Sequence, residues 1–261
     1  MEFRPCIDIH NGQVKQIVGG SLQDKGDRAT ENFVSSMSGA DYAHLYRRKG
    51  LRGGHIILLN PKDSPYYTAD VEQAKGALMA WPDSLQVGGG ITDENAGEWI
   101  AGGASHVIVT SYVFEQGEIR FDRIERLMDK VGKEHLVLDL SCRKKDDEYY
   151  IVTDRWQNFT KQPLNKELLS RLSSCCDEFL VHAVNVEGTK SGVDRELIAL
   201  LAENTDIPIT YAGGIGTMED IRTIETLGKG KINFTVGSAL DLFGGTLEFE
   251  KIVIFSKKMS K

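Results

Sequence analysis

The chain carries two copies of one glycine-rich motif, and this duplication restricts the fold more than any other feature. LQVGGGI at residues 85–91 recurs as ITYAGGI at residues 209–215, so that Gly213 corresponds to Gly89, 124 positions earlier in a chain of 261 residues. Two further pairs recur in the same order, at offsets of 131 and 127 positions: PCIDI at 5–9 with LVLDL at 136–140, and VTS at 109–111 with VGS at 236–238. Three landmarks in one order at nearly one spacing indicate two halves that fold alike.

Short apolar runs alternate with segments of helical periodicity along the chain. Eight runs are expected to be strands: 3–9, 55–59, 85–87, 106–109, 136–140, 179–182, 207–211 and 232–236. Four segments between them have polar starts and helical spacing of their apolar residues: 68–81, 120–132, 193–204 and 217–228. This alternation predicts parallel strands joined by right-handed crossovers.

Eight such units in about 250 residues are typical of a closed (β/α)8 TIM barrel, with a doubly wound open sheet as the alternative. The duplication predicts that the barrel consists of two repeated half-barrels, roughly 1–132 and 133–261. Because no linker composition separates the halves, we expect a single domain over residues 1–261.

Local signals refine this outline at three places. Gly132 and Gly228 stand where a left-handed helix C-cap is expected, and Thr217 begins a capping pattern with Asp220. The segment 146–159 is too long for an ordinary strand-to-helix loop and has its own alternating apolar run. We therefore predict a hairpin that lies over the fifth strand.

Composition excludes several classes of function. The formal net charge is −7, and no basic stripe is present that would neutralise a phosphate backbone, so nucleic acid is not an expected partner. No apolar run approaches the roughly 20 residues of a membrane-spanning helix. The N-terminal stretch is typical of a strand rather than of an export signal, so we expect a cytoplasmic protein; a plastid protein without its transit peptide would have the same sequence.

The four cysteines show no metal-binding spacing. Cys6, Cys142, Cys175 and Cys176 form neither a CxxC motif nor a pattern with histidine, and the adjacent pair cannot easily bridge. We expect four free thiols in a reducing compartment and no metal site.

The repeated glycines suggest two anion sites. In a parallel barrel the strand C-termini carry the site, where Gly88-Gly89-Gly90 and Gly213-Gly214 follow the third and seventh strands. Glycines allow backbone N–H groups to approach an anion closely. Thr110-Ser111 and Gly237-Ser238 follow the fourth and eighth strands and add hydroxyls where a short helix is expected to start. One phosphate is expected between strands three and four and another between strands seven and eight; the alternative is that these glycines only form tight turns.

Two aspartates are the candidate catalytic residues. Asp8 and Asp139 each end an apolar strand, where a carboxylate is costly unless it is paired, hydrogen bonded or functional. As residues of the first and fifth of eight strands, they are expected to face each other across the barrel mouth. Two opposed acids suit a proton abstraction coupled to a proton donation. The alternative is an ion pair or a strand-end cap.

Three other side chains are weaker candidates. His182 ends the sixth strand and could line the site, whereas the remaining histidines are expected to be surface or packing residues. Trp156 in the predicted hairpin could stack on a planar ligand or anchor its own loop. Lys15, after the first strand, could contact an anion or be solvated.

Taken together, the motifs resemble one known family. They span residues 4–245 and are RPCIDIHNGQVKQIVGG, LQVGGGI, SHVIVTSYVF, LVLDLSCRK, IVTDRWQNF, DEFLVHAVNVEG, YAGGI and TVGSALDLFGG. The chain resembles the ProFAR isomerases of histidine biosynthesis (phosphoribosylformimino-aminoimidazole carboxamide ribotide isomerases), particularly their eukaryotic-type branch. The resemblance implies an Amadori rearrangement of an aminoaldose into the aminoketose PRFAR, on a small substrate with a phosphate at each end.

The resemblance also implies roles for individual residues. Asp8 would be the general base that takes the C2′ proton, and Asp139 the general acid that assists ribose ring opening, although the sequence does not fix which acid donates. Four residues in the matching motifs join the expected substrate-binding set: Gly20, Arg155, Glu187 and Gly188. No metal or organic cofactor is implied, and we expect a monomer.

The chain departs from the bacterial pattern of this family. Leu58 replaces an aspartate, Ala183 replaces a threonine, and Glu187 stands near the place of another aspartate, one residue closer to the strand. Asn185, Glu187 or His182 are the candidates to supply the auxiliary hydrogen bonds.

Three other functions stay open at this point. The cyclase subunit of imidazole glycerol phosphate synthase also resembles two fused halves with an acid on strands one and five. A catalytically silent phosphate-binding barrel would carry the same glycines. An isomerase that also accepts the analogue from the tryptophan pathway is the third alternative.

Overall fold

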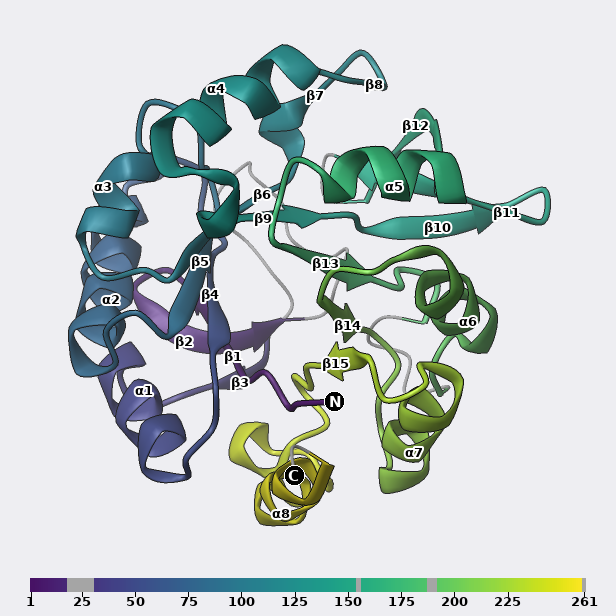
Figure 1. The fold of residues 1–261 in the computed structure, drawn as a ribbon. Coiled ribbons are helices and arrows are strands. Elements are labelled where there is room, and N and C mark those ends of the chain that lie inside the picture. The colour runs from purple at the N-terminus through teal and green to yellow at the C-terminus, as the bar shows by residue number, and fades with distance from the viewer. Residues whose placement is uncertain (18–30, 154–155, 187–191, 260–261) are drawn as a thin grey trace.

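The eight expected strands form a parallel barrel (Figure 1). The computed structural model describes residues 1–17, 31–153, 156–186 and 192–259. The barrel strands are β1 (Cys6–His10), β4 (Gly54–Leu58), β5 (Leu85–Gly88), β6 (His106–Val109), β9 (Leu136–Asp139), β13 (Glu178–His182), β14 (Ile209–Ala212) and β15 (Ile232–Phe234). Each strand lies beside its predecessor in chain order, and every pair is parallel.

Backbone hydrogen bonds between the residues just before β1 and the last strand, β15, close the barrel. The amide of Arg4 donates to the carbonyl of Phe234 at 2.8 Å, and the amide of Phe234 donates to the carbonyl of Glu2 at 3.0 Å. These bonds leave no free edge between β1 and β15, so the open-sheet alternative is excluded and the (β/α)8 prediction is confirmed. With three strands between them on either side, β1 and β9 lie opposite each other, as the duplication predicts.

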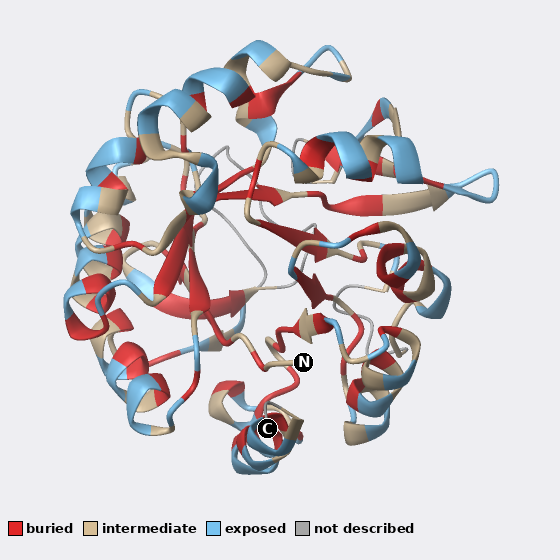
Figure 2. Ribbon diagram, in the orientation of Figure 1, coloured by how far each residue is buried: buried red, intermediate tan, exposed pale blue. Residues whose placement is uncertain are grey.

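Helices surround the barrel and bury one side against it (Figure 2). They are α1 (Gly39–Arg48), α2 (Tyr67–Ala80), α3 (Ala96–Ala101), α4 (Phe121–Val131), α5 (Lys166–Ser173), α6 (Arg195–Asn204), α7 (Met218–Leu227) and α8 (Phe249–Met259). The last helix completes the closure, because Phe249 packs on Phe3 with ring centroids 6.1 Å apart. No helix among the described residues is long and apolar enough to cross a membrane.

The predicted helix ends are correct in one of three cases. The Thr217 hydroxyl accepts from the amide of Asp220, whose carboxylate accepts from the Thr217 amide in return, which confirms the capping box. Gly132, after α4, has a positive φ of 77°, but its ψ of 152° lies outside the left-handed helical region, so the left-handed cap predicted there is not formed. The prediction for Gly228 is wrong, because its φ is −76° and the chain turns left-handed one residue later, at Lys229.

Three antiparallel additions lie outside the eight-strand pattern. They are the pair β2 (Gln13–Ile17) and β3 (Glu31–Val34), the hairpin β7 (Phe114–Glu115) and β8 (Glu118–Ile119), and the sheet β10 (Cys142–Lys145), β11 (Glu148–Thr153) and β12 (Asn158–Pro163). The hairpin predicted for 146–159 is confirmed, and β10 pairs with it directly after β9.

The barrel interior is filled in layers of alternating character. At the amino-terminal end of the strands, Arg4, Gln86 and Thr210 all hydrogen bond to the carboxylate of Glu178, whose side chain is only 4% exposed. This satisfies a buried charge that would otherwise be costly. An apolar layer follows toward the carboxyl-terminal end: Ile57, Ile108, Val137 and Leu180.

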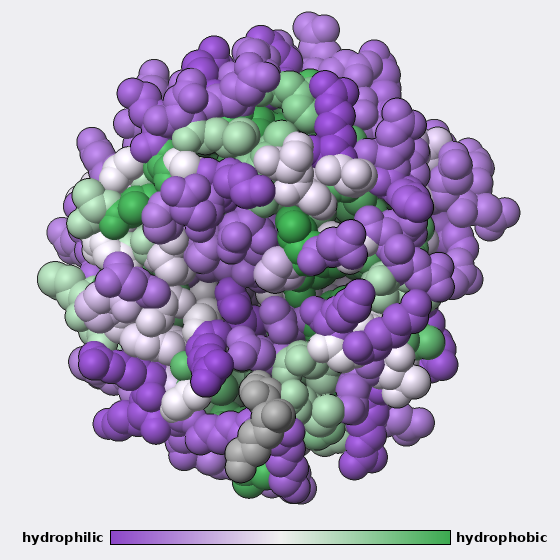
Figure 3. Space-filling model, in the orientation of Figure 1, coloured by the Kyte–Doolittle hydropathy of each residue, from purple (hydrophilic) through white to green (hydrophobic). Residues whose placement is uncertain are grey.

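The outer surface is mainly hydrophilic on the face shown in Figure 3, where apolar residues form small groups. Large apolar side chains that are exposed in the described chain include Met79 on α2 and Ile254 on α8.

Candidate active site

A cavity of about 520 Å³ opens at the carboxyl ends of the barrel strands. Strands from both halves contribute to its wall, as expected for a parallel barrel. Eleven of the residues predicted from the sequence line it: Asp8, Gly88, Gly89, Gly90, Thr110, Ser111, Asp139, Trp156, His182, Gly213 and Gly237. The structure therefore brings the two candidate acids and both glycine motifs to one space.

The two glycine turns have closely similar φ angles. Gly89 and Gly213 have φ of 103° and 115°, and Gly90 and Gly214 have φ of 69° and 73°. These values lie where L side chains are strained, so the turns require glycine. The repeat detected in the sequence is thus a repeat of geometry, with each turn following an equivalent strand, β5 or β14.

The residues that follow the next strand in each half, β6 and β15, are less alike. Thr110 caps a short 3-10 helix that starts at Ser111, as predicted. After β15, the corresponding 3-10 helix starts only at Asp241, three residues beyond Ser238. Of the predicted residues in the second half, Gly214 and Ser238 do not line the cavity.

Asp139 is held by its neighbours at the end of β9. Its Oδ1 accepts from the amide of Ser141 at 3.0 Å and from the Ser141 hydroxyl at 2.9 Å. Nδ1 of His182 lies 3.3 Å from the same oxygen and 3.4 Å from the hydroxyl. These contacts fix the direction of the Asp139 carboxylate. His182 lies beside it because β13 and β9 are neighbouring strands.

Asp8 is held by a residue that the sequence did not single out. Nε2 of Gln16 donates to Oδ2 of Asp8 at 2.9 Å. Gln16 lies on β2, which folds back along β1 and brings the amide over the strand end. The same amide lies so close to Gly237 that a Cβ there would overlap Gln16 Oε1. Only the strand pairing reveals this contact, since Gln16 belongs to no motif that ends a strand.

Two further cavity residues, Cys6 and His55, lie below Asp8. Each is 4% exposed, and they are partners in the parallel register of β1 and β4. Burial lowers the pKa of His55 to about 3, with a further contribution from nearby His182, so the imidazole is neutral. Burial and the neighbouring Asp8 raise the pKa of the Cys6 thiol.

Lys15 does not line the cavity. It is 4% exposed, and its ammonium forms an ion pair of 2.6 Å with Glu31 on β3. Lys62, in the loop after β4, does line the cavity, and its aliphatic stem lies next to Gly90. Lys62 is therefore the better-placed cation for an anion at the first glycine turn, a role that sequence reasoning missed.

Trp156 lies at the cavity with a strained backbone, since its φ is 68°. Its ring lies 5.9 Å from that of His182, with the planes tilted by 42°. This position is compatible with stacking on a planar ligand. The predictions for Gly20, Arg155, Glu187 and Gly188 fall outside the described residues.

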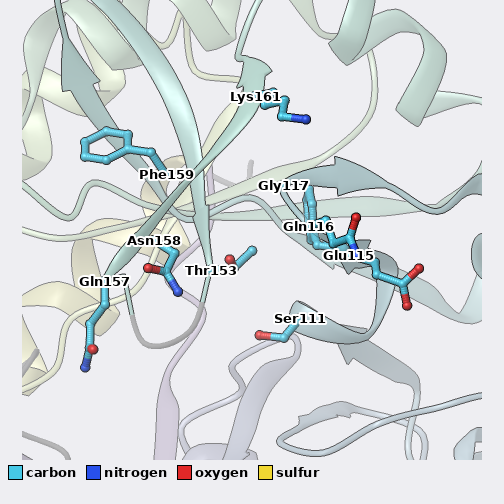
Figure 4. Close-up of a pocket in the computed structure, with 10 residues that line it drawn as sticks. Ser111, Glu115, Gln116, Gly117, Thr153, Gln157, Asn158, Phe159 and Lys161 are labelled. Carbon is cyan, nitrogen blue, oxygen red and sulfur yellow. The ribbon is translucent and has the colours of Figure 1, made fainter.

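A second, more polar cavity of about 400 Å³ adjoins the first (Figure 4). Ser111 and Thr153 line both cavities. Its other residues come from the β7–β8 hairpin, from β12 and from Gln157 just before β12: Phe114, Glu115, Gln116, Gly117, Gln157, Asn158, Phe159 and Lys161. The site thus continues from the main cavity past Ser111 and Thr153 to the β7–β8 hairpin and β12.

A closed parallel barrel whose mouth carries matched glycine turns and one acid from each half defines the class: a (β/α)8 barrel with a twofold-repeated site. The family model described as histidine biosynthesis protein matches residues 2–247. The chain belongs to this family.

Three relatives illustrate the similarity. All are named 1-(5-phosphoribosyl)-5-((5-phosphoribosylamino)methylideneamino)imidazole-4-carboxamide isomerases. The protein of Medicago truncatula, described as chloroplastic, is 52% identical over 257 residues, which cover 97% of this chain and 81% of that protein. The protein of Yarrowia lipolytica is 44% identical, covering 100% and 99%, and that of Saccharomyces cerevisiae is 42% identical, covering 98% of each.

Proposed function

We propose that this chain is a ProFAR isomerase, which converts the aminoaldose ProFAR into the aminoketose PRFAR. The observation that carries the proposal is the placement of Asp8 and Asp139, from opposite strands, on one cavity that both glycine turns also line. The names of the relatives support the same reaction.

The two glycine turns would hold the two phosphates of the substrate. Glycine at Gly89, Gly90 and Gly213 puts no Cβ between the backbone of each turn and the cavity, so N–H groups there can approach an anion closely. Lys62 and the Thr110 and Ser111 hydroxyls would assist at the first turn, and Gly237 at the second. Anchoring both ends would fix the ribose between the two carboxylates, which removes much of the entropic barrier.

Asp139 would act first, as the general acid. It protonates the ribose ring oxygen while the C1′–O bond breaks, and the nitrogen lone pair forms a C1′=N bond. The hydrogen bonds from Ser141 and the adjacent His182 hold the carboxyl group in one direction for this transfer.

Asp8 would then act as the general base. It takes the C2′ proton, and the electrons of that C–H bond form an enaminol as the iminium nitrogen becomes neutral. The enaminol gains a proton at C1′ and loses its hydroxyl proton, which gives the aminoketose with no net change in atoms. Gln16 would orient the Asp8 carboxylate for the abstraction.

The experiment is to supply the purified chain with ProFAR alone and follow the absorbance. Conversion to PRFAR supports the proposal, whereas no absorbance change contradicts it. The cyclase alternative would instead require PRFAR together with an ammonia source, and a silent barrel would turn over neither. A parallel assay with the tryptophan-pathway analogue separates a specific from a bifunctional isomerase.

We further propose that residues 1–261 act as one domain and as a monomer. Closure of the barrel by Arg4 and Phe234 and the packing of Phe3 on Phe249 tie the two ends of the chain together. Sedimentation of the active protein and a single cooperative unfolding transition are the checks. For the compartment we propose the cytoplasm, or a plastid, as for the Medicago truncatula relative.

A further inference from the structure

Three side chains below the barrel mouth bring together a sulfur, a nitrogen and an oxygen donor, all of which Zn²⁺ binds in proteins. A sulfur of Cys6, a carboxylate oxygen of Asp8 and a ring nitrogen of His55 all lie within 4.8 Å of one another. Cys6 and Asp8 are two residues apart on β1, so both point to the same face of the strand. Cys6 and His55 are register partners, which places the imidazole beside the thiol. Sequence spacing could not reveal this cluster, because 49 residues separate the two strand partners.

The histidine of this cluster has no role in holding the fold by hydrogen bonding. His55 is 4% exposed, and no other described side chain or backbone group hydrogen bonds to its ring. It nevertheless lines the main cavity together with Cys6 and Asp8. A buried imidazole that faces a cavity without a partner retains the capacity to bind a ligand there.

We propose that Cys6, Asp8 and His55 form a binding site for a thiophilic divalent cation, with Zn²⁺ and Cd²⁺ as the ions that fit. One sulfur, one nitrogen and one oxygen donor leave the fourth tetrahedral position open to the cavity. Tetrahedral zinc, with bonds of about 2.0 to 2.3 Å, separates its donors by roughly 3.5 Å. A closure of roughly 1.3 Å at most, within reach of side-chain rotation, completes the site.

Binding requires no oxidant or reductant. The thiol of Cys6 loses its proton to solvent as the metal–sulfur bond forms, while the imidazole and carboxylate donate lone pairs. The metal would engage the carboxylate that the proposed function assigns as general base. On that function, which this consequence assumes, an occupied site suppresses turnover; the binding itself does not depend on the function.

The test of binding uses Cd²⁺ alone, titrated into the purified chain after chelation and dialysis. We expect an ultraviolet cadmium–thiolate charge-transfer band that saturates at one Cd²⁺ per chain. Two variants on different strands, Cys6→Ser and His55→Gln, are each expected to weaken Cd²⁺ binding at least tenfold. The control, Cys175→Ser, removes a partly exposed thiol outside the cavity and is expected to leave Cd²⁺ binding unchanged. Far-ultraviolet circular dichroism verifies folding, and Cys6→Ala is the replacement if Cys6→Ser is misfolded. A band of equal strength in folded Cys6 and His55 variants, or its loss in Cys175→Ser, overturns the proposal.

The test of the consequence adds Zn²⁺ to the ProFAR assay. Turnover is expected to fall at least tenfold in the unmodified chain and to return on addition of a chelator, with Cys6→Ser resistant to the same Zn²⁺ concentration. Full turnover at saturating Zn²⁺ overturns the inhibitory role. An absence of turnover in metal-free protein refutes the proposed function instead, so the two failures are distinguishable.

Discussion

Gly90 and Gly214 occupy equivalent turns of the two half-barrels, yet replacement by alanine should affect them unequally. Their φ angles are nearly the same, 69° and 73°. A Cβ on Gly90 would lie 3.4 Å from Cε of Lys62, an ordinary contact with a flexible side chain. A Cβ on Gly214 would overlap the backbone carbonyl of Gly192 and lie 3.0 Å from Cγ2 of Val186.

The magnitudes follow from these surroundings. Left-handed strain on alanine costs about 1–2 kcal/mol at either position. Gly90→Ala should therefore lower the free energy of unfolding by about that amount. Gly214→Ala adds a clash with backbone that cannot rotate away, so its loss should be at least ~3 kcal/mol. The effect of a glycine-to-alanine change on the unfolded chain is common to both and cancels in the comparison.

Urea denaturation followed by circular dichroism measures both free energies of unfolding. The slope of the free energy of unfolding against urea concentration should be the same in both variants as in the unmodified chain, because the surface exposed on unfolding is the same. Losses that agree within about 0.5 kcal/mol would refute the reasoning, because shared strain alone would then explain both variants.

The remaining predictions concern catalysis and acid stability. Asp8→Asn and Asp139→Asn should each lower kcat at least ~100-fold with substrate binding largely kept, and unchanged turnover in both would contradict the assigned roles. Ser141→Ala removes one of the hydrogen bonds to Asp139 but keeps the backbone donor, so kcat should fall about tenfold with KM nearly constant; a rise in KM alone would show a binding role instead. Burial lowers the pKa of His106 despite the opposing Asp177 carboxylate, so the unfolded chain binds the proton more readily and stability is lost as the pH falls through about 6.5. His106→Gln should therefore reduce the loss of unfolding free energy between pH 7 and 5, and an unaltered pH dependence would count against this.

The sequence predicted the parts of the molecule that repeat. Because β1 and β9 both carry an aspartate in the same apolar pattern, the opposition of Asp8 and Asp139 followed from strand count alone. Asp139 ends β9 as predicted, whereas β1 continues two residues beyond Asp8, to His10. The glycine turns followed in the same way, since a positive φ has a strong preference for one residue type. Gly228 shows the limit: the left-handed position shifted by one residue, to Lys229, and composition alone does not fix such a shift.

The parts that do not repeat were not predictable from motifs. Gln16 reaches Asp8 only because β2 folds back on β1, and a short strand of this kind has no signal that specifies its partner. Lys15 was a reasonable anion contact by position, but its neighbour on β3 is an acid, and the ion pair with Glu31 engages it. Cys6 and His55 meet through strand register, which joins residues far apart in the sequence.

The similarity of the two glycine turns also bears on the direction in which a substrate enters. A molecule with a phosphate at each end, held only by two such turns, would fit a symmetric mouth in either of two orientations, and one of them would present the wrong carbons to the acids. The turns alone would therefore bind the two phosphates without selecting one orientation of the ligand. The orientation has to be set by residues that the two halves do not share. These are Gln16 on β2, beside Asp8, and Ser141 and His182, beside Asp139. On the proposed function, the repeated turns would bind the two phosphates, and these unrepeated residues would distinguish the two ends of the ligand.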